Sequence, residues 1–247
     1  REVRAKEEQV TALVFKIQAN MDPSHRERMA LARVVSGKLM RGMRLKHVRT
    51  GKQFALHTPQ FFFARDRQLA EEAFGGDVVG IPNHGTLRIG DTLTESEDLR
   101  FTGVPHFAPE ILRRVRLDDA MKAKKLRQAL VELAEEGVVQ LFRPQDGLPP
   151  IVGVVGPLQL DVLQSRLKGE YGVGIGFEST PYTLARWVTG ERAKMEDFAM
   201  LNRSAMCDDL DGDPVFLASS SFMMRRAVET NPDLAFHDIK QIGMASV

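Results

Sequence analysis

The sequence predicts a β-barrel followed by an α+β ferredoxin-like domain with a C-terminal extension. Two observations lead to this fold class. The first hundred or so residues contain short apolar runs separated by glycine and proline turns, with little helical periodicity. After residue 104 the predicted elements follow the order strand, helix, strand, strand, helix, strand, which is that of a split βαβ unit. A chain of 247 residues is long enough for two such domains.

The barrel is predicted from its short strands. Apolar and polar positions alternate in the first of them, where Leu13, Phe15 and Ile17 share one face. Glycine-containing turns at Gly37, Gly42 and 75–76 separate the later runs. Strands of this length and spacing favour a small closed barrel. The predicted strands cover residues 12–19, 29–35, 43–48, 53–57 and 78–81.

The second half of the chain combines strands with helices. The first predicted helix begins near Asp118, carries Leu126, Leu130 and Leu133 at helical spacing, and ends at Gly137. The second begins at Pro157 and carries an apolar stripe of its own, formed by Leu160, Leu163 and Leu167. Predicted strands cover 111–117, 138–142, 151–155 and 173–177. The extension is predicted to add a strand at 183–188, helices at 193–202 and 221–230, and strands near Val215 and Phe236.

No internal repeat is visible in the sequence. We therefore expect a linker at 1–9, the barrel at 10–103, and the α/β ferredoxin-like domain at 104–247. The chain begins with Arg1, without an initiator methionine or a signal peptide, which predicts a boundary inside a longer protein. Tyr182 and Trp187 are predicted to pack at a domain junction.

Composition limits the class of protein. A hydrophobic content of 43% with 27% charged residues is typical of a globular chain, and no apolar run is long enough to span a membrane. The single cysteine, Cys207, excludes an internal disulfide and predicts a reducing compartment, the cytoplasm. Its acidic neighbours Asp208 and Asp209 should raise its thiol pKa, so we expect no reactive role for it.

Charge is distributed in blocks, although the net charge is only +1. Residues 22–67 contain eleven Lys or Arg against three acids, and residues 68–98 contain seven acids and one base, Arg88. Residues 100–127 are basic again, with eight bases against three acids. Such blocks favour a basic surface for a polyanion, although a solvated surface could also carry them.

Catalytic and metal-binding motifs are not evident. Gly37-Lys38 and Gly51-Lys52 lack the spaced first glycine and the following Ser or Thr of a phosphate-binding loop. Asp209, Asp211 and Asp213 alternate like the start of a calcium loop, but Pro214 and Ser220 occupy the glycine and glutamate positions, which favours an acidic surface loop. The six histidines show no zinc-binding spacing. We therefore expect a binding protein with no catalytic residue, no metal and no cofactor of its own.

Several motifs resemble translational GTPases. The second-domain signature of that superfamily is matched by Arg33-Val-Val-Ser-Gly-Lys-Leu-Met-Arg-Gly42, Gly76-Asp-Val-Val-Gly-Ile81 and Ile89-Gly-Asp-Thr92. Other motifs resemble the bacterial peptide chain release factor 3 family, and not elongation factor G: Phe15-Lys-Ile-Gln-Ala-Asn-Met-Asp-Pro23, Asn83-His-Gly-Thr86, Phe101-Thr-Gly-Val-Pro-His-Phe-Ala-Pro-Glu110, Glu135-Glu-Gly-Val-Val-Gln-Leu-Phe-Arg-Pro144 and Gly156-Pro-Leu-Gln-Leu-Asp161. The resemblance covers about Val10 to His237 and is weaker in the loop at 206–214 and in the last ten residues.

This resemblance implies the second and third domains of a release factor 3, with the GTP-binding domain absent from this chain. It implies a monomer that docks on the small ribosomal subunit, through RNA and protein, for a GTPase that recycles codon-reading release factors after peptide release. GTP would be bound by the missing domain, which is a partner in cis. Two alternatives remain: the equivalent region of another translational GTPase such as elongation factor G, and a hydrolase with an RNA-binding barrel.

The resemblance also directs the choice of candidate residues. Arg44 and Lys46 are two apart on a strand and share one face, while Met43 and Leu45 point inward. Contacts to small-subunit RNA are predicted among Lys38, Arg41, Arg44, Lys46, Arg49 and Lys52. Asn83 and His84 form a turn that either faces the missing GTP-binding domain or is only a turn. The run 61–63, three phenylalanines, is predicted as barrel core plus one exposed aromatic, or as a stacking platform for nucleic acid.

Overall fold

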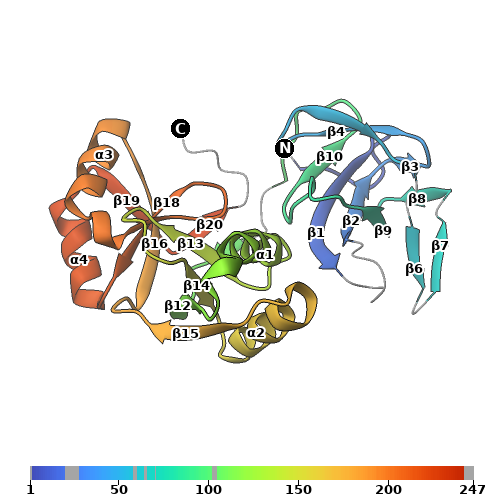
Figure 1. The fold of residues 1–247 in the computed structure, drawn as a ribbon. Coiled ribbons are helices and arrows are strands. Elements are labelled where there is room, and N and C mark those ends of the chain that lie inside the picture. Colours follow the sequence, from blue (N-terminus) through green and yellow to red (C-terminus); the bar gives the residue numbers. More distant parts are fainter. Residues whose placement is uncertain are drawn as a thin grey trace. The chain divides into compact units, whose positions relative to one another are not determined.

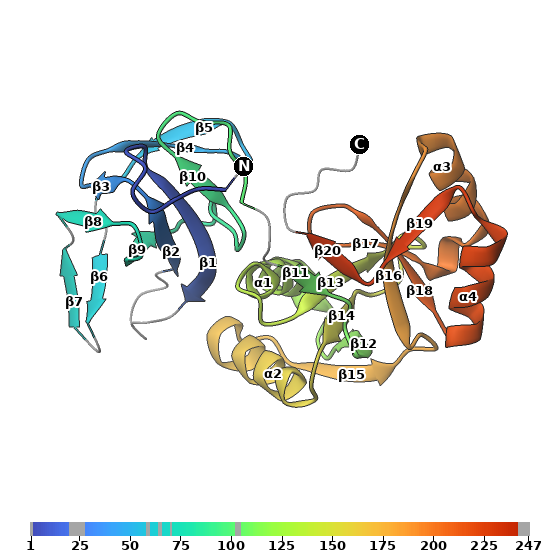
Figure 2. The ribbon, with the colours of Figure 1, turned by 180° about the vertical axis from the view of Figure 1, so that it is seen from behind.

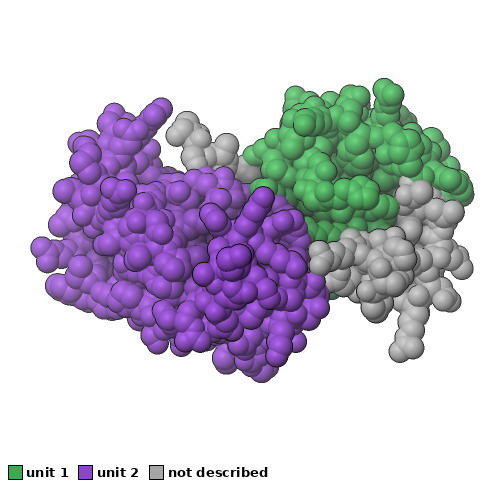
Figure 3. Space-filling view, in the orientation of Figure 1, with its two compact units in different colours: residues 1–104, 241–243 green, residues 105–240, 244–247 purple. Residues whose placement is uncertain are grey.

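The computed structural model describes residues 2–19, 28–57, 60–63, 66–69, 71–101 and 105–241. The chain divides into two compact units, coloured separately in Figure 3. Unit 1 comprises Arg1–Val104 with Gln241–Gly243, and unit 2 comprises Pro105–Lys240 with Met244–Val247. In the described part of the chain, no helix combines the length and the apolar character that crossing a bilayer requires.

Unit 1 is built from antiparallel strands (Figure 1). Eight of them form one sheet in the order β5-β4-β10-β1-β2-β9-β6-β7, and β3 pairs with β8 in a second, two-stranded sheet. The larger sheet is a half-barrel around a core that includes Val14, Leu45, Val79 and Leu93. The strands are β1 (Thr11–Ala19), β2 (Arg28–Ser36), β3 (Lys38–Met40), β4 (Arg44–His47), β5 (Lys52–Ala55), β6 (Gln60–Phe63), β7 (Asp66–Leu69), β8 (Glu72–Phe74), β9 (Val78–Pro82) and β10 (Thr92–Thr94).

The alternation predicted for the first strand is interrupted by a β-bulge. The register between β1 and β2 shifts between Val14 and Lys16. Val14 is buried before the shift and Ile17 after it, whereas Phe15 is 41% exposed. An extra residue in one strand exchanges the buried and the exposed positions that follow it. The prediction that Leu13, Phe15 and Ile17 share one face was therefore wrong at this point.

Unit 2 contains all the helices of the described residues. They are η1 (Ala120–Lys122), α1 (Ala123–Glu135), α2 (Leu158–Tyr171), α3 (Arg192–Leu201), η2 (Arg203–Ala205) and α4 (Ser221–Thr230). Its strands are β11 (Pro105–Phe107), β12 (Ile111–Leu117), β13 (Gln140–Pro144), β14 (Ile151–Val154), β15 (Ile175–Ser179), β16 (Leu184–Gly190), β17 (Met206–Asp208), β18 (Pro214–Ala218), β19 (Leu234–His237) and β20 (Ile239–Gln241). Figure 2 shows these elements from behind.

The eight-stranded sheet of unit 2 contains the ferredoxin-like topology twice. Its first half has the order β15-β12-β14-β13, which is 4-1-3-2 when the four strands are numbered along the chain. Its second half, β17-β18-β16-β19, has the same order when it is read from the opposite end. The halves join at β13, which pairs with β14 through Gln140–Phe142 and with β17 through Arg143 and Pro144. The predicted ferredoxin-like fold is confirmed. The C-terminal extension is a second βαββαβ unit, which the sequence did not reveal because no residue pattern repeats.

Helix packing divides unit 2 into separate cores. Leu130 of α1 and Leu163 of α2 are buried in one cluster, and Tyr171 donates a hydrogen bond of 2.7 Å to Glu132, so the two helices lie side by side as predicted. Phe198 of α3 packs edge-to-face on Phe216, with ring centroids 5.2 Å apart.

A third cluster includes Leu112, Phe142, Trp187 and Val215. Trp187 is therefore a core residue of unit 2, in a cluster formed by strands of both ferredoxin-like halves of its sheet. The junction at which it packs is the one between these halves. Tyr182, which packs partly buried against this cluster, donates a hydrogen bond of 2.6 Å to the carbonyl of Ser204.

Candidate functional site

The six predicted RNA contacts lie on and between β3, β4 and β5. Arg44 and Lys46 point to one side of β4, while Leu45 and His47 are buried on the other side, as the alternation predicted. Lys52 pairs with His47 across β4 and β5, so it belongs to the opposite face from Arg44 and Lys46. The six side chains therefore do not form one continuous basic face.

Four of these cations are paired with acids of unit 1. Lys38 forms an ion pair with Glu72 and lies 5.5 Å from the centroid of the Phe74 ring. Arg41 is 3.2 Å from a carboxylate oxygen of Glu71.

Lys46 pairs with Asp98, and Arg49 with Asp91. All four acids come from residues 68–98, so four cations of the basic block are neutralised by the acidic block that follows it in the sequence. Of the six, only Arg44 and Lys52 have side chains without a hydrogen bond or ion pair to another described residue.

Arg49 has a structural role. Its guanidinium makes two hydrogen bonds to the carboxylate of Asp91, of 2.6 and 2.9 Å, and a third of 3.0 Å to the carbonyl of Thr86. His47 lies 2.8 Å from the same carboxylate, which is 3% exposed. Burial alone raises the pKa of Asp91, but the hydrogen bonds from Arg49 and the Arg88 amide, together with the adjacent His47 ring, outweigh it and lower the pKa. This buried cluster stabilises the β4–β10 end of the sheet.

The side chain of Asn83 is satisfied within its own turn. Its amide nitrogen donates to the carbonyl of Leu87 at 2.8 Å, and its oxygen accepts from the amides of Gly85, Thr86 and Leu87. The residue is 4% exposed. These contacts favour the role of a turn-former for Asn83, whereas His84 is exposed beside it and remains the candidate for an outward contact. The side chains of the phenylalanine run at 61–63 lie outside the described residues.

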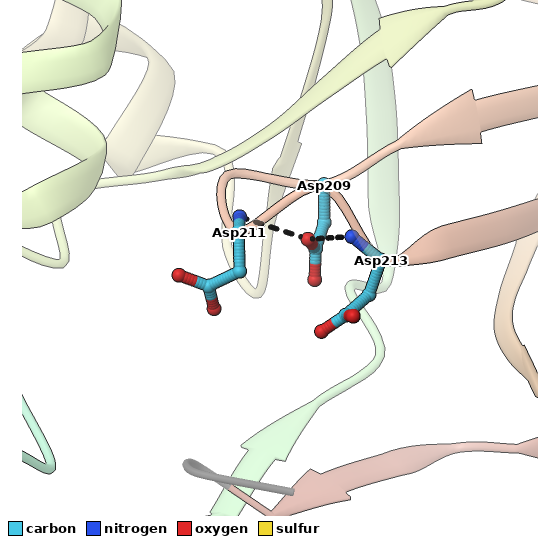
Figure 4. A group of neighbouring side chains, drawn as sticks. All are labelled: Asp209, Asp211 and Asp213. Carbon is cyan, nitrogen blue, oxygen red and sulfur yellow. Dashed lines mark hydrogen bonds between the residues drawn. The ribbon is translucent and has the colours of Figure 1, made fainter. Parts of the chain in front are cut away.

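The aspartate loop between β17 and β18 binds a lysine. One carboxylate oxygen of Asp209 accepts the amides of Asp211 and Asp213, each at 2.9 Å, which turns the three carboxylates toward one another (Figure 4). The ammonium group of Lys240 lies between them, 2.5 Å from Asp209 and 3.1 Å from Asp211, and also pairs with Asp213.

This loop is only partly a surface loop. Asp209 is 7% exposed and accepts a hydrogen bond of 2.9 Å from Trp187. The predicted acidic surface loop is therefore corrected to a buried site for Lys240. Nearby, burial and the carboxylates of Asp146 and Asp208 raise the pKa of the Cys207 thiol to about 12.

Other bases of unit 2 differ in whether they are paired. Arg113 and Arg114 donate to the carbonyls of Leu112 and Pro149, and Arg116 is 3.7 Å from Asp118. By contrast, three exposed cations of α1 have no such partner among the described residues: Lys124, Lys125 and Arg127. Sequence analysis did not single them out, although its basic count for residues 100–127 includes them.

Comparison with known proteins identifies the two halves separately. Residues 9–96 match the family model described as elongation factor G domain 2. Residues 101–228 match the model described as class II release factor RF3, C-terminal domain. A crystal structure of a protein from Thermus thermophilus is similar over 75% of this chain, with 26% sequence identity and a TM-score of 0.59. The chain corresponds to 27% of the length of that protein.

The barrel and the tandem ferredoxin-like sheet thus define the class as a translation factor of the GTPase superfamily. More narrowly, the chain belongs to the family of the class II release factor RF3, C-terminal domain, whose model covers more than half of its residues. The predicted resemblance to the second and third domains of release factor 3 is confirmed.

Proposed function

We propose that this chain is the ribosome-docking region of a translation-termination GTPase that recycles codon-reading release factors after peptide release. The observation that carries the proposal is the succession of two matches, the elongation factor G domain 2 type at 9–96 and the release factor C-terminal domain type at 101–228. The match at 9–96 is to a domain of an elongation factor, so it does not distinguish elongation from termination. The match at 101–228 is to a release factor domain and favours termination over an elongation factor G fragment.

The polar clusters of the structure support binding rather than hydrolysis. The side chain of Asp91 is 3% exposed and contacts Arg49 and His47, and the side chain of Lys240 is 8% exposed and contacts three aspartates. Both groups are occupied by internal partners, so neither presents a free nucleophile or base to a substrate. We accordingly propose that this chain does not hydrolyse GTP, and that a separate domain in cis binds the nucleotide in the cytoplasm.

The proposal predicts that the isolated chain competes with a complete release factor 3. Ribosomes carrying a codon-reading release factor after peptide release would be mixed with release factor 3, GTP and increasing amounts of this chain. We expect the departure of the codon-reading factor to slow as the chain occupies the docking site. An unrelated protein of the same size and net charge is the control, because it reproduces non-specific electrostatic binding.

Two outcomes would count against the proposal. If the chain does not cosediment with small ribosomal subunits, the docking role is wrong. If it binds but slows only translocation by elongation factor G, the elongation factor alternative is correct. Selective inhibition of release factor recycling would support the termination role.

A further inference from the structure

The first half of α1 displays cations that the rest of unit 2 does not neutralise. Lys124, Lys125 and Arg127 are exposed, and none of their side chains has a hydrogen bond or ion pair to another described residue. The acids nearest in sequence are engaged elsewhere. Asp118 is 3.7 Å from Arg116, Asp119 accepts a hydrogen bond of 3.0 Å from the amide of Met121, and Glu132 accepts hydrogen bonds from Gln128 and Tyr171. The three charges are therefore available to an external anion.

The order of charges along α1 opposes the helix dipole. The first turn contains no acid and the last turn no base, whereas Glu132 and Glu135 lie in the C-terminal half. Cations near the positive N-terminal end and carboxylates near the negative C-terminal end are each unfavourable.

Pairing within the helix does not relieve this arrangement. The residues four positions after the three cations are uncharged: Gln128, Ala129 and Val131. Helix stability therefore gives no reason for this order of charges, and a binding role would supply one.

We infer that Lys124, Lys125 and Arg127 form an RNA-binding surface, the α1 surface, which contacts phosphate groups without base specificity. The inference deepens the proposed function, because the RNA would be that of the small ribosomal subunit. It differs from the predicted barrel contacts, four of which already pair with acids of unit 1. Apart from Met121 at its edge, 92% exposed, the surface lacks the apolar centre typical of a protein interface, and lysines are depleted in such interfaces.

The test compares two triple variants of the full chain. Lys124→Gln, Lys125→Gln and Arg127→Gln together neutralise the α1 surface. The control combines Arg203→Gln, Arg225→Gln and Arg226→Gln, which removes three exposed cations of η2 and α4 whose side chains likewise lack a described partner. Both variants lose the same net charge. Binding to a fluorescein-labelled RNA duplex and to small ribosomal subunits would be measured over a salt series.

We expect the α1 variant to lose affinity for both RNA probes, on the order of 100-fold at 0.1 M salt, and the control variant to bind nearly as the natural sequence does. The log-affinity against log-salt slope should decrease in magnitude by about 2 to 3, since three phosphate contacts disappear. The melting temperature of the α1 variant should not fall, because the substitutions remove charges that oppose the dipole. A loss of binding therefore cannot be ascribed to unfolding.

Three results would overturn the inference. The first is equal weakening by both variants, which would leave only net charge as the cause. The second is unchanged binding by the α1 variant to RNA that the natural sequence binds. The third is displacement of the RNA by polyglutamate at matched charge, which would favour an acidic protein partner. A fourth result separates the two proposals. If the natural sequence does not bind small subunits but binds the duplex through the three α1 cations, the proposed function is wrong and the α1 surface is still an RNA-binding surface.

Discussion

Replacing Lys240 tests whether the three aspartates of the β17–β18 loop depend on its ammonium group. Lys240→Met keeps most of the side-chain volume and removes the charge. In the natural sequence the side chains of Lys240 and Asp209 are 8% and 10% exposed. The carboxylate of Asp209 would remain buried beside Asp211 and Asp213 without a cation. We expect the folded state of unit 2 to be strongly destabilised.

The magnitude follows from the contacts that remain. Removing one partner of a buried ion pair costs about 3 to 5 kcal/mol. The cost should lie near the lower limit, about 3 kcal/mol, because Asp209 keeps its hydrogen bonds from Trp187 and two backbone amides. The other two aspartates are also partly solvated, with side chains that are 43% and 22% exposed.

Urea denaturation followed by the emission of Trp187 is a suitable assay, because the chain contains one tryptophan and it lies in unit 2. With a urea dependence of about 2 kcal/mol per molar, the midpoint should shift by about 1.5 M. Burial by itself lowers the pKa of Lys240, but the aspartates outweigh it and raise the pKa above 10.5. The lysine therefore contributes fully at lower pH and loses its contribution only above that value, so the shift should be equal at pH 7 and pH 9.

Arg192→Met is the matched control. Arg192 also pairs with an acid, Glu196, but its side chain is 92% exposed, so its loss should leave the midpoint unchanged. If Lys240→Met shifts the midpoint no more than Arg192→Met, the ammonium does not compensate a buried carboxylate, and the reasoning about this loop is refuted.

Three further predictions concern other groups. Because the pKa of Asp91 is lowered, its stabilisation is present above its ordinary pKa of 3.8 and is lost as the pH falls through the lower folded value. The hydrogen-exchange protection factors of β4 and β10, which are corrected for the pH dependence of intrinsic amide exchange, should fall on acidification in the natural sequence but not in Asp91→Asn. Equal acid sensitivity of the two proteins would contradict this. Buried Cys207, with its raised pKa, should react with a thiol reagent at pH 8 only in urea, and rapid native labelling would refute its burial. Calorimetry should detect no guanine nucleotide binding to the chain, and a micromolar site would overturn the assignment of GTP to another domain.

Much of the fold was predictable because local patterns decided it. Leu126, Leu130 and Leu133 marked α1, and the spacing of Leu163 and Leu167 marked α2, since helical periodicity needs no knowledge of distant residues. The bulge after Val14 was not predictable, because it depends on how β1 pairs with β2. The second ferredoxin-like unit was missed for a related reason. Its topology is defined by strand pairings, such as that of β13 with β17, and such pairings produce no periodic pattern in the sequence.

The candidate site was less predictable, because sequence analysis gives the positions of charges but not their partners. The shared outward face of Arg44 and Lys46 followed from strand alternation. The pairing of Lys46 with Asp98 joins residues far apart in the chain, and so does the contact of Lys240 with Asp209. Because the sequence does not show hydrogen-bond partners, Asn83 was also considered for an interdomain role. Its side chain in fact makes its hydrogen bonds within its own turn.

The local geometry of each unit explains why cations of the barrel find acidic partners and cations of α1 do not. Folding of the half-barrel brings its basic and acidic blocks close together, so Lys38 of β3 meets Glu72 of β8 and Arg49 meets Asp91. A helix offers neighbours only three or four positions away, and α1 places its acids beyond that reach of Lys124 and Lys125. Four cations of the barrel block are thus paired internally, whereas Lys124, Lys125 and Arg127 of α1 have no such partner among the described residues. For this chain we therefore expect a polyanion surface where exposed cations lack an internal acidic partner, and not simply where bases are dense in the sequence.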